Sequence, residues 1–296
     1  MTTVADVAPL EEAVERALST GDGDHLHVLG YGEITTVLAW PQADGPWACK
    51  RLPVFDGEDR IGEYRSRLGE YISALRERGI NVHDSRLEVV PTTGGMAVYI
   101  VQPTIDPDLL GPEVLRCSSE ADGRALLRDV IEHVAHVVRP TLGLDAQLSN
   151  WACVDSELLY FDVSTPMLRD EQGRDLLDTE LFIAVLPPFL RPVVRHLLLG
   201  SLLDQFFDVR STALDLVANL YKEELATWVP VAIEMANDRL APEPLLTVDE
   251  ARRYRRKDAR LWEMLQRTRR LDRAWQQRIR RRRYPFLLPG RINRRL

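Results

Sequence analysis

The order of two residue patterns along this chain limits its fold more than any other feature. Short runs rich in β-branched and aromatic residues fill the segment 25–102, and one helical pattern, Glu58–Arg78, interrupts them. Runs of this length predict strands, whereas apolar residues that recur every three or four positions predict a helix. The predicted strands are His25–Leu29, Ile34–Trp40, Trp47–Leu52, Leu87–Val90 and Met96–Gln102, after a short helix at Pro9–Leu18.

Beyond Gln102 the pattern becomes helical. A proline-rich connector over residues 103–112 is typical of a boundary between two lobes. Two short strands, Trp151–Val154 and Leu158–Phe161, interrupt the helical part. The predicted helices are Glu113–Cys117, Gly123–Val138, Asp175–Leu186, Pro192–Leu203, Ser211–Glu224, Val231–Leu240 and Val248–Arg283.

These patterns predict an α+β chain with two lobes. Residues 1–102 would form a small antiparallel, β-rich N-lobe with one helix against its sheet, and residues 103–112 a hinge. Residues 113–247 would form a larger helical C-lobe, followed by a basic helical extension over residues 248–296.

Charge is distributed unevenly along the chain. Residues 250–296 hold 18 Lys and Arg against 4 Asp and Glu, whereas the other residues hold 20 against 41. A basic end of this kind could bind phosphate, an anionic lipid or nucleic acid. Because few aromatic residues interleave with the run Arg278–Arg283 and the rest of the chain is acidic, we favour an intramolecular or interfacial role for it.

The remaining composition favours a cytoplasmic protein. The three cysteines, Cys49, Cys117 and Cys153, are far apart and odd in number, so neither a disulfide framework nor a zinc site follows. The most hydrophobic stretch, residues 181–207, is broken by prolines and charged residues, which argues against a membrane span.

A possible phosphate site lies in the first three predicted strands. Gly30 and Gly32 stand between two strands, where glycines let the backbone approach an anion closely, although an ordinary β-turn has the same composition. Lys50 follows in Ala48-Cys49-Lys50 on the third strand. Only three of the 38 basic residues are lysines, so a lysine at this position indicates a need for a compact ammonium group.

Three polar residues of the second lobe complete the pattern. Asp145 and Asn150 lie five residues apart in a loop between a helix and a strand, and Asp162 follows the next apolar strand. In phosphoryl transfer, an aspartate positions the acceptor hydroxyl, while an asparagine and a second aspartate hold Mg²⁺. Each residue alone could equally serve only to stabilise a turn, because Asp and Asn are common in turns.

In this order and spacing, the residues resemble the protein-kinase-like superfamily, in its aminoglycoside and choline phosphotransferase branch, over roughly residues 25–240. The whole chain is also similar to an uncharacterised bacterial family of kinase-like proteins. The resemblance implies ATP and Mg²⁺ as cofactors, with Asp145 as the catalytic base and Asn150 and Asp162 as metal ligands. It also implies that Lys50 contacts the phosphates and that the linker from Gln102 faces the adenine.

Several departures from the family pattern leave alternatives open. Gly143 replaces the histidine two residues before the catalytic aspartate, and Val163 and Ser164 follow Asp162 in place of phenylalanine and glycine. The helix glutamate expected to pair with the lysine could be Glu70, which we favour for its spacing, or Glu63.

Three functions remain in view at this stage. The first is an ATP-dependent kinase that phosphorylates a hydroxyl or amine of a small molecule. The second is a catalytically weak pseudokinase that acts as a nucleotide-dependent binding or regulatory module. The third is an adaptor protein that binds an anionic surface through its basic C-terminal end.

Overall fold

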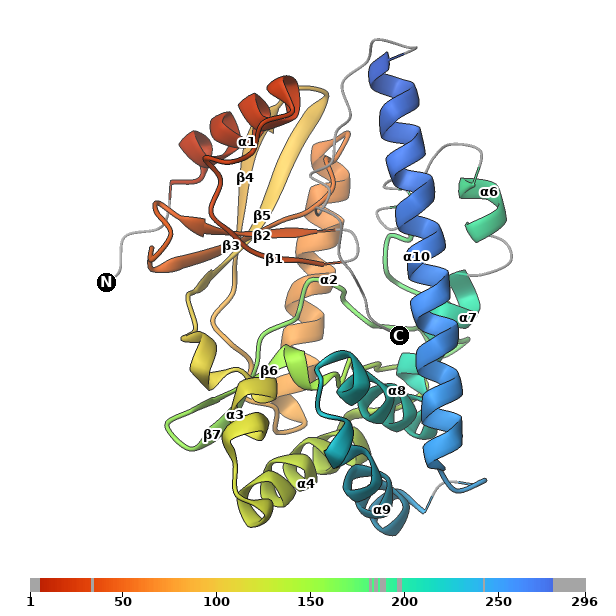
Figure 1. Cartoon of the computed structure of the whole chain (residues 1–296). Coiled ribbons are helices and arrows are strands. Elements are labelled where there is room, and N and C mark those ends of the chain that lie inside the picture. The colour runs from red at the N-terminus through yellow and green to blue at the C-terminus, as the bar shows by residue number, and fades with distance from the viewer. Residues whose placement is uncertain are drawn as a thin grey trace.

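The computed structural model describes residues 6–278, except 33–34, 181–182, 184–185, 187–189, 196–198 and 242. Strands dominate the first part of the chain, and helices dominate the part that follows the strand β5 (Figure 1). The chain is therefore α+β, with an antiparallel sheet and helices in an arrangement that is compatible with two lobes.

A five-stranded antiparallel sheet forms the first part, in the order β1-β2-β3-β5-β4. Its strands are β1 (Val28–Tyr31), β2 (Thr36–Trp40), β3 (Trp47–Arg51), β4 (Arg86–Thr92) and β5 (Gly95–Pro103). The β4–β5 hairpin turns through Thr93 and Gly94, and Gly94 has a φ of 95°, which glycine adopts at no steric cost. The central strand is β3, so a residue on it lies in the middle of the sheet.

The two faces of the sheet are covered by different helices. On one face, α1 (Ala8–Thr20) packs its residues Leu10, Val14 and Leu18 into a core shared with alternate strand residues. On the other face, α2 (Glu58–Glu77) buries Ile61, Tyr64, Leu68, Tyr71 and Leu75, which repeat at helical spacing. Successive strand residues point to opposite faces, so Cys49 and Arg51 turn toward α1 whereas Lys50 turns away from it.

The second part consists of helices around a short hairpin. The hairpin strands are β6 (Trp151–Val154) and β7 (Glu157–Tyr160), joined by Asp155 and Ser156, both at positive φ as a type I′ turn requires. The helices are α3 (Gly111–Cys117), α4 (Glu120–Val137), α6 (Arg191–Val193), α7 (Leu199–Asp204), α8 (Val209–Lys222), α9 (Val229–Leu240) and α10 (Val248–Arg278).

One apolar core connects the two parts of the chain. It contains Leu52 and Ile100 from the sheet, Leu75 from α2, and Val130 and Leu216 from α4 and α8. Helices α4, α8 and α9 pack against one another, and α10 lies along α8. This shared core holds the sheet against the loops that leave α4 and β7.

Most predicted elements are confirmed within one to three residues at their ends, but three expectations need correction. The predicted helix Pro192–Leu203 is found as two helices, α6 and α7, and residues 196–198 between them lie outside the described part of the chain. The predicted helix Asp175–Leu186 does not begin at Asp175, because that residue forms an isolated bridge with Arg169. The connector 103–112 is less irregular than expected: β5 extends to Pro103, a 3₁₀ turn spans Pro107–Leu109, and α3 begins at Gly111.

Two further expectations can be compared with the structure only in part. The predicted basic extension is a single helix to Arg278, and its residues 279–296 lie outside the described part of the chain. Among the described residues, no helix combines the length and the apolar character needed to cross a bilayer.

Candidate functional site

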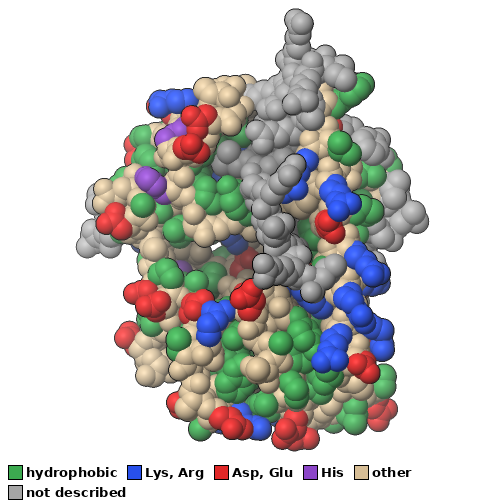
Figure 2. Space-filling view, in the orientation of Figure 1, with side chains coloured by type: hydrophobic (Ala, Val, Ile, Leu, Met, Phe, Trp, Pro, Cys, Tyr) green, Lys and Arg blue, Asp and Glu red, His purple; other side chains and the backbone are tan. Residues whose placement is uncertain are grey.

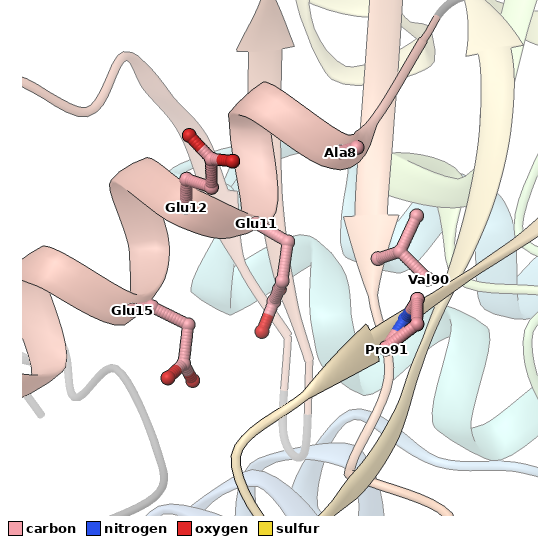
Figure 3. A pocket seen from close by; sticks show the side chains of 6 residues that line it. All are labelled: Ala8, Glu11, Glu12, Glu15, Val90 and Pro91. Carbon is pink, nitrogen blue, oxygen red and sulfur yellow. The ribbon is translucent and has the colours of Figure 1, made fainter.

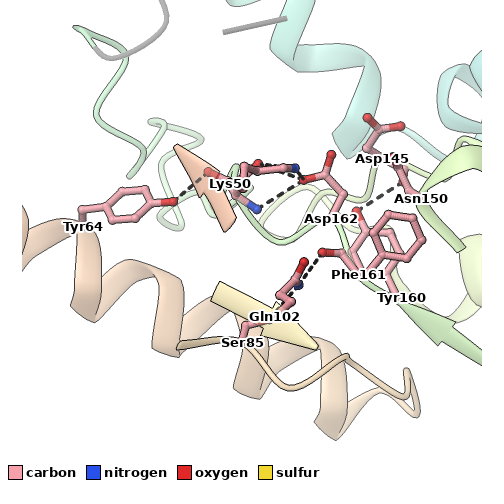
Figure 4. A network of polar contacts seen from close by, with 10 residues as sticks. Lys50, Tyr64, Ser85, Gln102, Asp145, Asn150, Tyr160, Phe161 and Asp162 are labelled. Atoms are coloured by element: carbon pink, nitrogen blue, oxygen red, sulfur yellow. Dashed lines mark hydrogen bonds and ion pairs between the residues drawn. The ribbon is translucent and has the colours of Figure 1, made fainter. Parts of the chain in front are cut away.

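The contact between Lys50 and Asp162 is the centre of the candidate site (Figure 4). Lys50 Nζ lies 2.7 Å from Asp162 Oδ1 and 3.1 Å from Ser164 Oγ, although 112 residues separate the lysine from the aspartate. Both charged side chains are largely buried, with 14% of Lys50 and 29% of Asp162 exposed. The contact joins the middle strand of the sheet to the segment that leaves β7.

The surroundings of Asp162 favour its ionised form. Burial alone would raise the pKa of this carboxyl, but the nearby Lys50 ammonium and the hydrogen bonds from Lys50 and Ser164 outweigh it and lower the pKa. Ser164 donates from Oγ at 2.8 Å to the same oxygen that binds Lys50, Asp162 Oδ1. Among the described residues none donates to Asp162 Oδ2, so this oxygen is available to a further ligand.

The loop between α4 and β6 carries Asp145 and Asn150, and its conformation is held by local hydrogen bonds. Asn150 Nδ2 and the Tyr160 hydroxyl donate to the backbone carbonyl of Asp145 at 3.2 and 3.3 Å. The amide of Gln147 donates to Asp145 Oδ1 at 3.2 Å. No described residue donates to Asn150 Oδ1, which leaves an amide oxygen free beside the segment that ends in Asp162.

Asp145 lies in an acidic environment. Burial, followed by the negative charges of Asp215 and Asp162, raises the pKa of Asp145 to about 7. A carboxyl group with this pKa exchanges its proton near neutral pH, which suits a general base.

Asp215 was not expected from the sequence as part of the site. It is 5% exposed on α8, and its Oδ1 accepts hydrogen bonds from the Tyr254 hydroxyl at 2.8 Å and from Asn219 Nδ2 at 3.1 Å. Its Oδ2 is buried without a hydrogen-bond partner, and burial raises its pKa. The available signal was a single carboxylate within the apolar run from Ala213 to Ala218.

Gln102, the predicted adenine-facing residue, is buried at the end of β5 and makes contacts within the protein. Its Nε2 donates to Ser85 Oγ at 2.9 Å and to the Phe161 carbonyl at 2.8 Å. The side chain thus ties β5 to the residue before Asp162 (Figure 4). Its amide group orients the segment that carries the aspartate.

Gly30 lies on the edge strand β1, and Gly32 directly follows the end of this strand. Gly30 pairs with Val37, and Val37 pairs with Lys50, so Gly30 and Lys50 are separated by two strand spacings, about 10 Å. A Cβ atom on Gly30 would meet nothing within 4 Å, so the space beside it is open. Gly32 closes the turn by donating its amide to the Thr35 carbonyl at 3.0 Å.

The expected pairing of Lys50 with a glutamate of α2 is wrong for this structure. Glu70 is exposed and accepts hydrogen bonds from Ser66 Oγ at 2.9 Å and Arg67 Nη1 at 2.7 Å, and Glu63 is exposed as well. The residue of α2 that reaches the site is Tyr64, whose hydroxyl donates to the Ser164 carbonyl at 2.9 Å. The apolar stripe of α2 faces the core, which forces its glutamates toward solvent.

A separate pocket lies on the opposite face of the sheet and does not belong to this site. It has a volume of about 450 Å³ and is lined by Ala8, Glu11, Glu12, Glu15, Val90 and Pro91 (Figure 3). Two of its three glutamates are already engaged: Arg51 binds the carboxylate of Glu11, and Thr92 and Thr93 donate hydrogen bonds to Glu15.

Comparison with known proteins adds a family but no activity. No curated protein matches this chain. One family model, described as a family of unknown function (DUF6206), matches residues 9–273, which include the whole sheet, every residue of the site and most of α10. The chain therefore belongs to the DUF6206 family.

Proposed function

We propose that this chain has a protein-kinase-like fold and transfers a phosphoryl group from Mg·ATP to a hydroxyl or amine of a small molecule. The observation that carries the proposal is the contact of Lys50 with Asp162. A lysine on the central strand that contacts the phosphates and an aspartate after the β6–β7 hairpin that holds Mg²⁺ are two of the charges that phosphoryl transfer uses.

The free donor atoms fit Mg²⁺ and the phosphates of a nucleotide. Mg²⁺ takes hard oxygen ligands, and it commonly uses only one or two protein side chains together with phosphates and water. Asn150 Oδ1 and Asp162 Oδ2 are such oxygens, and the Lys50 ammonium is placed to bind phosphate. Among the described residues no group of three or more His, Cys, Asp or Glu could hold a metal.

Asp145 is the group suited to the acceptor. When bound, Mg·ATP supplies the phosphoryl group, and the protein has to hold the acceptor hydroxyl in line and take up its proton. The raised pKa of Asp145 keeps its carboxylate basic enough to accept that proton near neutral pH. Removing this carboxylate should abolish transfer without preventing nucleotide binding.

A nucleotide-dependent binding module is the second candidate, and the surroundings of Lys50 favour it. Both glutamates of α2 that could have paired with Lys50, Glu63 and Glu70, are turned to solvent, so the lysine lacks the helix partner of an active kinase. In this second case Lys50→Met would abolish function in cells whereas Asp145→Asn would leave it intact.

A transfer assay separates these candidates. The full chain would be incubated with γ-labelled ATP, Mg²⁺ and a panel of hydroxyl- and amine-bearing metabolites, and labelled products would be counted. We expect transfer to at least one acceptor, lost in Asp145→Asn and retained in Asp129→Asn, a matched variant at an exposed aspartate. Bound Mg·ATP with neither transfer nor hydrolysis would overturn the enzymatic proposal and support the binding module.

A further inference from the structure

The helix α10 carries an outward face that the proposed function does not use. Its inner face includes the buried residues Ala251, Ala259 and Leu265; it packs on α8 and, at Leu265, on a cluster that contains Leu199 and Leu203 of α7. Directly opposite, residues spaced by three or four positions form one exposed line along the helix. We call this line the outer stripe: Arg253, Arg256, Lys257, Arg260, Met264, Arg267, Leu271 and Trp275.

The first half of the outer stripe is cationic. Arg253, Arg256, Lys257 and Arg260 are all exposed, and none forms an ion pair with a described residue. Other arginines of the helix do have acidic partners, as Arg255 does in Asp258. Figure 2 shows Lys and Arg side chains gathered along the side of the molecule that α10 occupies. Within the part of the chain that the structure describes, the four charges are therefore free for a partner.

The second half of the outer stripe is mostly apolar, and its arginine, Arg267, is paired with Glu263. Met264 is 53% exposed, Leu271 71% and Trp275 52%. These are three of the seven large hydrophobic side chains that are exposed in the described part of the chain, so they are concentrated on this one helix. Exposed apolar residues gathered on one surface indicate an interaction site.

This combination of residues restricts the partner. A second copy of the same stripe is unsuitable, because its cations would repel each other. A nucleic acid would engage the cations and could stack on Trp275, but it would leave Met264 and Leu271 in water. An anionic bilayer offers both phosphate groups for the cations and an apolar boundary for the three hydrophobic side chains.

We propose that the outer stripe of α10 docks the protein on an anionic lipid surface, with the helix lying parallel to the membrane plane. The cations contact the lipid headgroups, and Met264, Leu271 and Trp275 enter the boundary between headgroups and acyl chains. The site around Lys50 and Asp162 plays no part in this docking, so the proposal stands apart from the proposed function.

Vesicle sedimentation tests the electrostatic part. The full chain would be mixed with phosphatidylcholine vesicles containing either no anionic lipid or about 30 mol % phosphatidylglycerol. We expect binding to the anionic vesicles alone, weakening as salt is raised. Arg256→Glu with Lys257→Glu should reduce binding at least about 25-fold, since each of the two lost cations contributes about fivefold. Arg65→Glu with Arg128→Glu, two exposed arginines elsewhere with the same change in net charge, should leave binding nearly unchanged.

A second pair of variants tests the apolar part. Leu271→Ser with Trp275→Ser should reduce binding to the same vesicles by about tenfold or more, because buried apolar area contributes to interfacial binding. Leu109→Ser with Leu245→Ser, at two exposed leucines away from α10, should not. Circular dichroism would verify that every variant keeps its helix content.

Three results would overturn the proposal. The first is no binding to the anionic vesicles. The second is an equal loss in the matched control variants, which would mean that the contact is not located on α10. The third is tighter binding to a single-stranded oligonucleotide than to the vesicles, which would assign the stripe to nucleic acid.

Discussion

The ion pair between Glu11 of α1 and Arg51 of β3 gives the most quantitative prediction for stability. Arg51 donates from Nε and Nη2 to the two carboxylate oxygens at 2.8 and 2.7 Å, and the two residues are only 3% and 6% exposed. Glu11 also accepts hydrogen bonds from Tyr99 and Thr92 at 2.5 and 2.6 Å. Burial raises the pKa of Glu11, but Arg51 and these two hydroxyls outweigh it and lower the pKa.

Glu11→Ala should therefore be strongly destabilising. The substitution leaves the Arg51 guanidinium buried without its counter-charge, and breaking a buried pair from one side costs about 4 kcal/mol. For a chain of this size that loss corresponds to a decrease of about 8 °C in Tm. Since Arg51 follows Lys50 on β3, the same change should also loosen the strand that positions the lysine.

Urea denaturation followed by tryptophan fluorescence measures this effect. Glu12→Ala, at an exposed neighbour on the same helix, is the matched control and should change the free energy of unfolding by less than about 0.5 kcal/mol. The double variant Glu11→Ala with Arg51→Met should recover part of the loss, because it removes the uncompensated charge. A loss below about 1 kcal/mol for Glu11→Ala would refute the reasoning.

Three further predictions concern the site. The transfer rate should rise with pH through about 7 as Asp145 loses its proton. Asp215→Asn removes a negative charge near Asp145 and should therefore move this rise about one pH unit lower. An unchanged pH–rate profile in this variant would contradict the prediction. Since folding raises the pKa of Asp145 by about three units, its contribution to stability declines between about pH 4 and pH 7, so Asp145→Asn should stabilise the fold at pH 8 by up to about 4 kcal/mol in urea denaturation. Glu70→Ala should leave Mg·ATP affinity within about twofold of the wild type by calorimetry, whereas Lys50→Met should abolish binding.

The elements that could be predicted from the sequence are those in which one residue period dominates. The stripe Ile61, Tyr64, Leu68, Tyr71 and Leu75 predicted α2 and its buried face, because helical spacing alone decides which side chains reach the core. The two hairpins were predictable from their turn residues as well as their strands. In contrast, residues near Asp175 have helical composition but follow a strand-like bridge to Arg169, a long-range contact that local pattern does not encode.

The residues of the candidate site could be predicted where their order and spacing along the chain identify them. They could not be predicted where the packing of helices decides which side chains reach the site. Lys50 and Asp162 were named from order and spacing, and the structure brings them together. Glu70 was chosen by its distance along the chain from Lys50, but the apolar stripe of α2 turns it to solvent. Asp215 reaches the site because α8 packs beside the loop of Asp145, and one sequence contains no record of that packing.

Calorimetric titration with Mg·ATP tests the central claim most directly. The proposal predicts binding of Mg·ATP to the full chain that requires Mg²⁺ and is lost in Asp162→Ala, while Asp129→Ala, at an exposed aspartate, binds as the wild type does. Absence of binding by the wild type, or equal affinity in Asp162→Ala, would contradict a nucleotide site at Lys50 and Asp162.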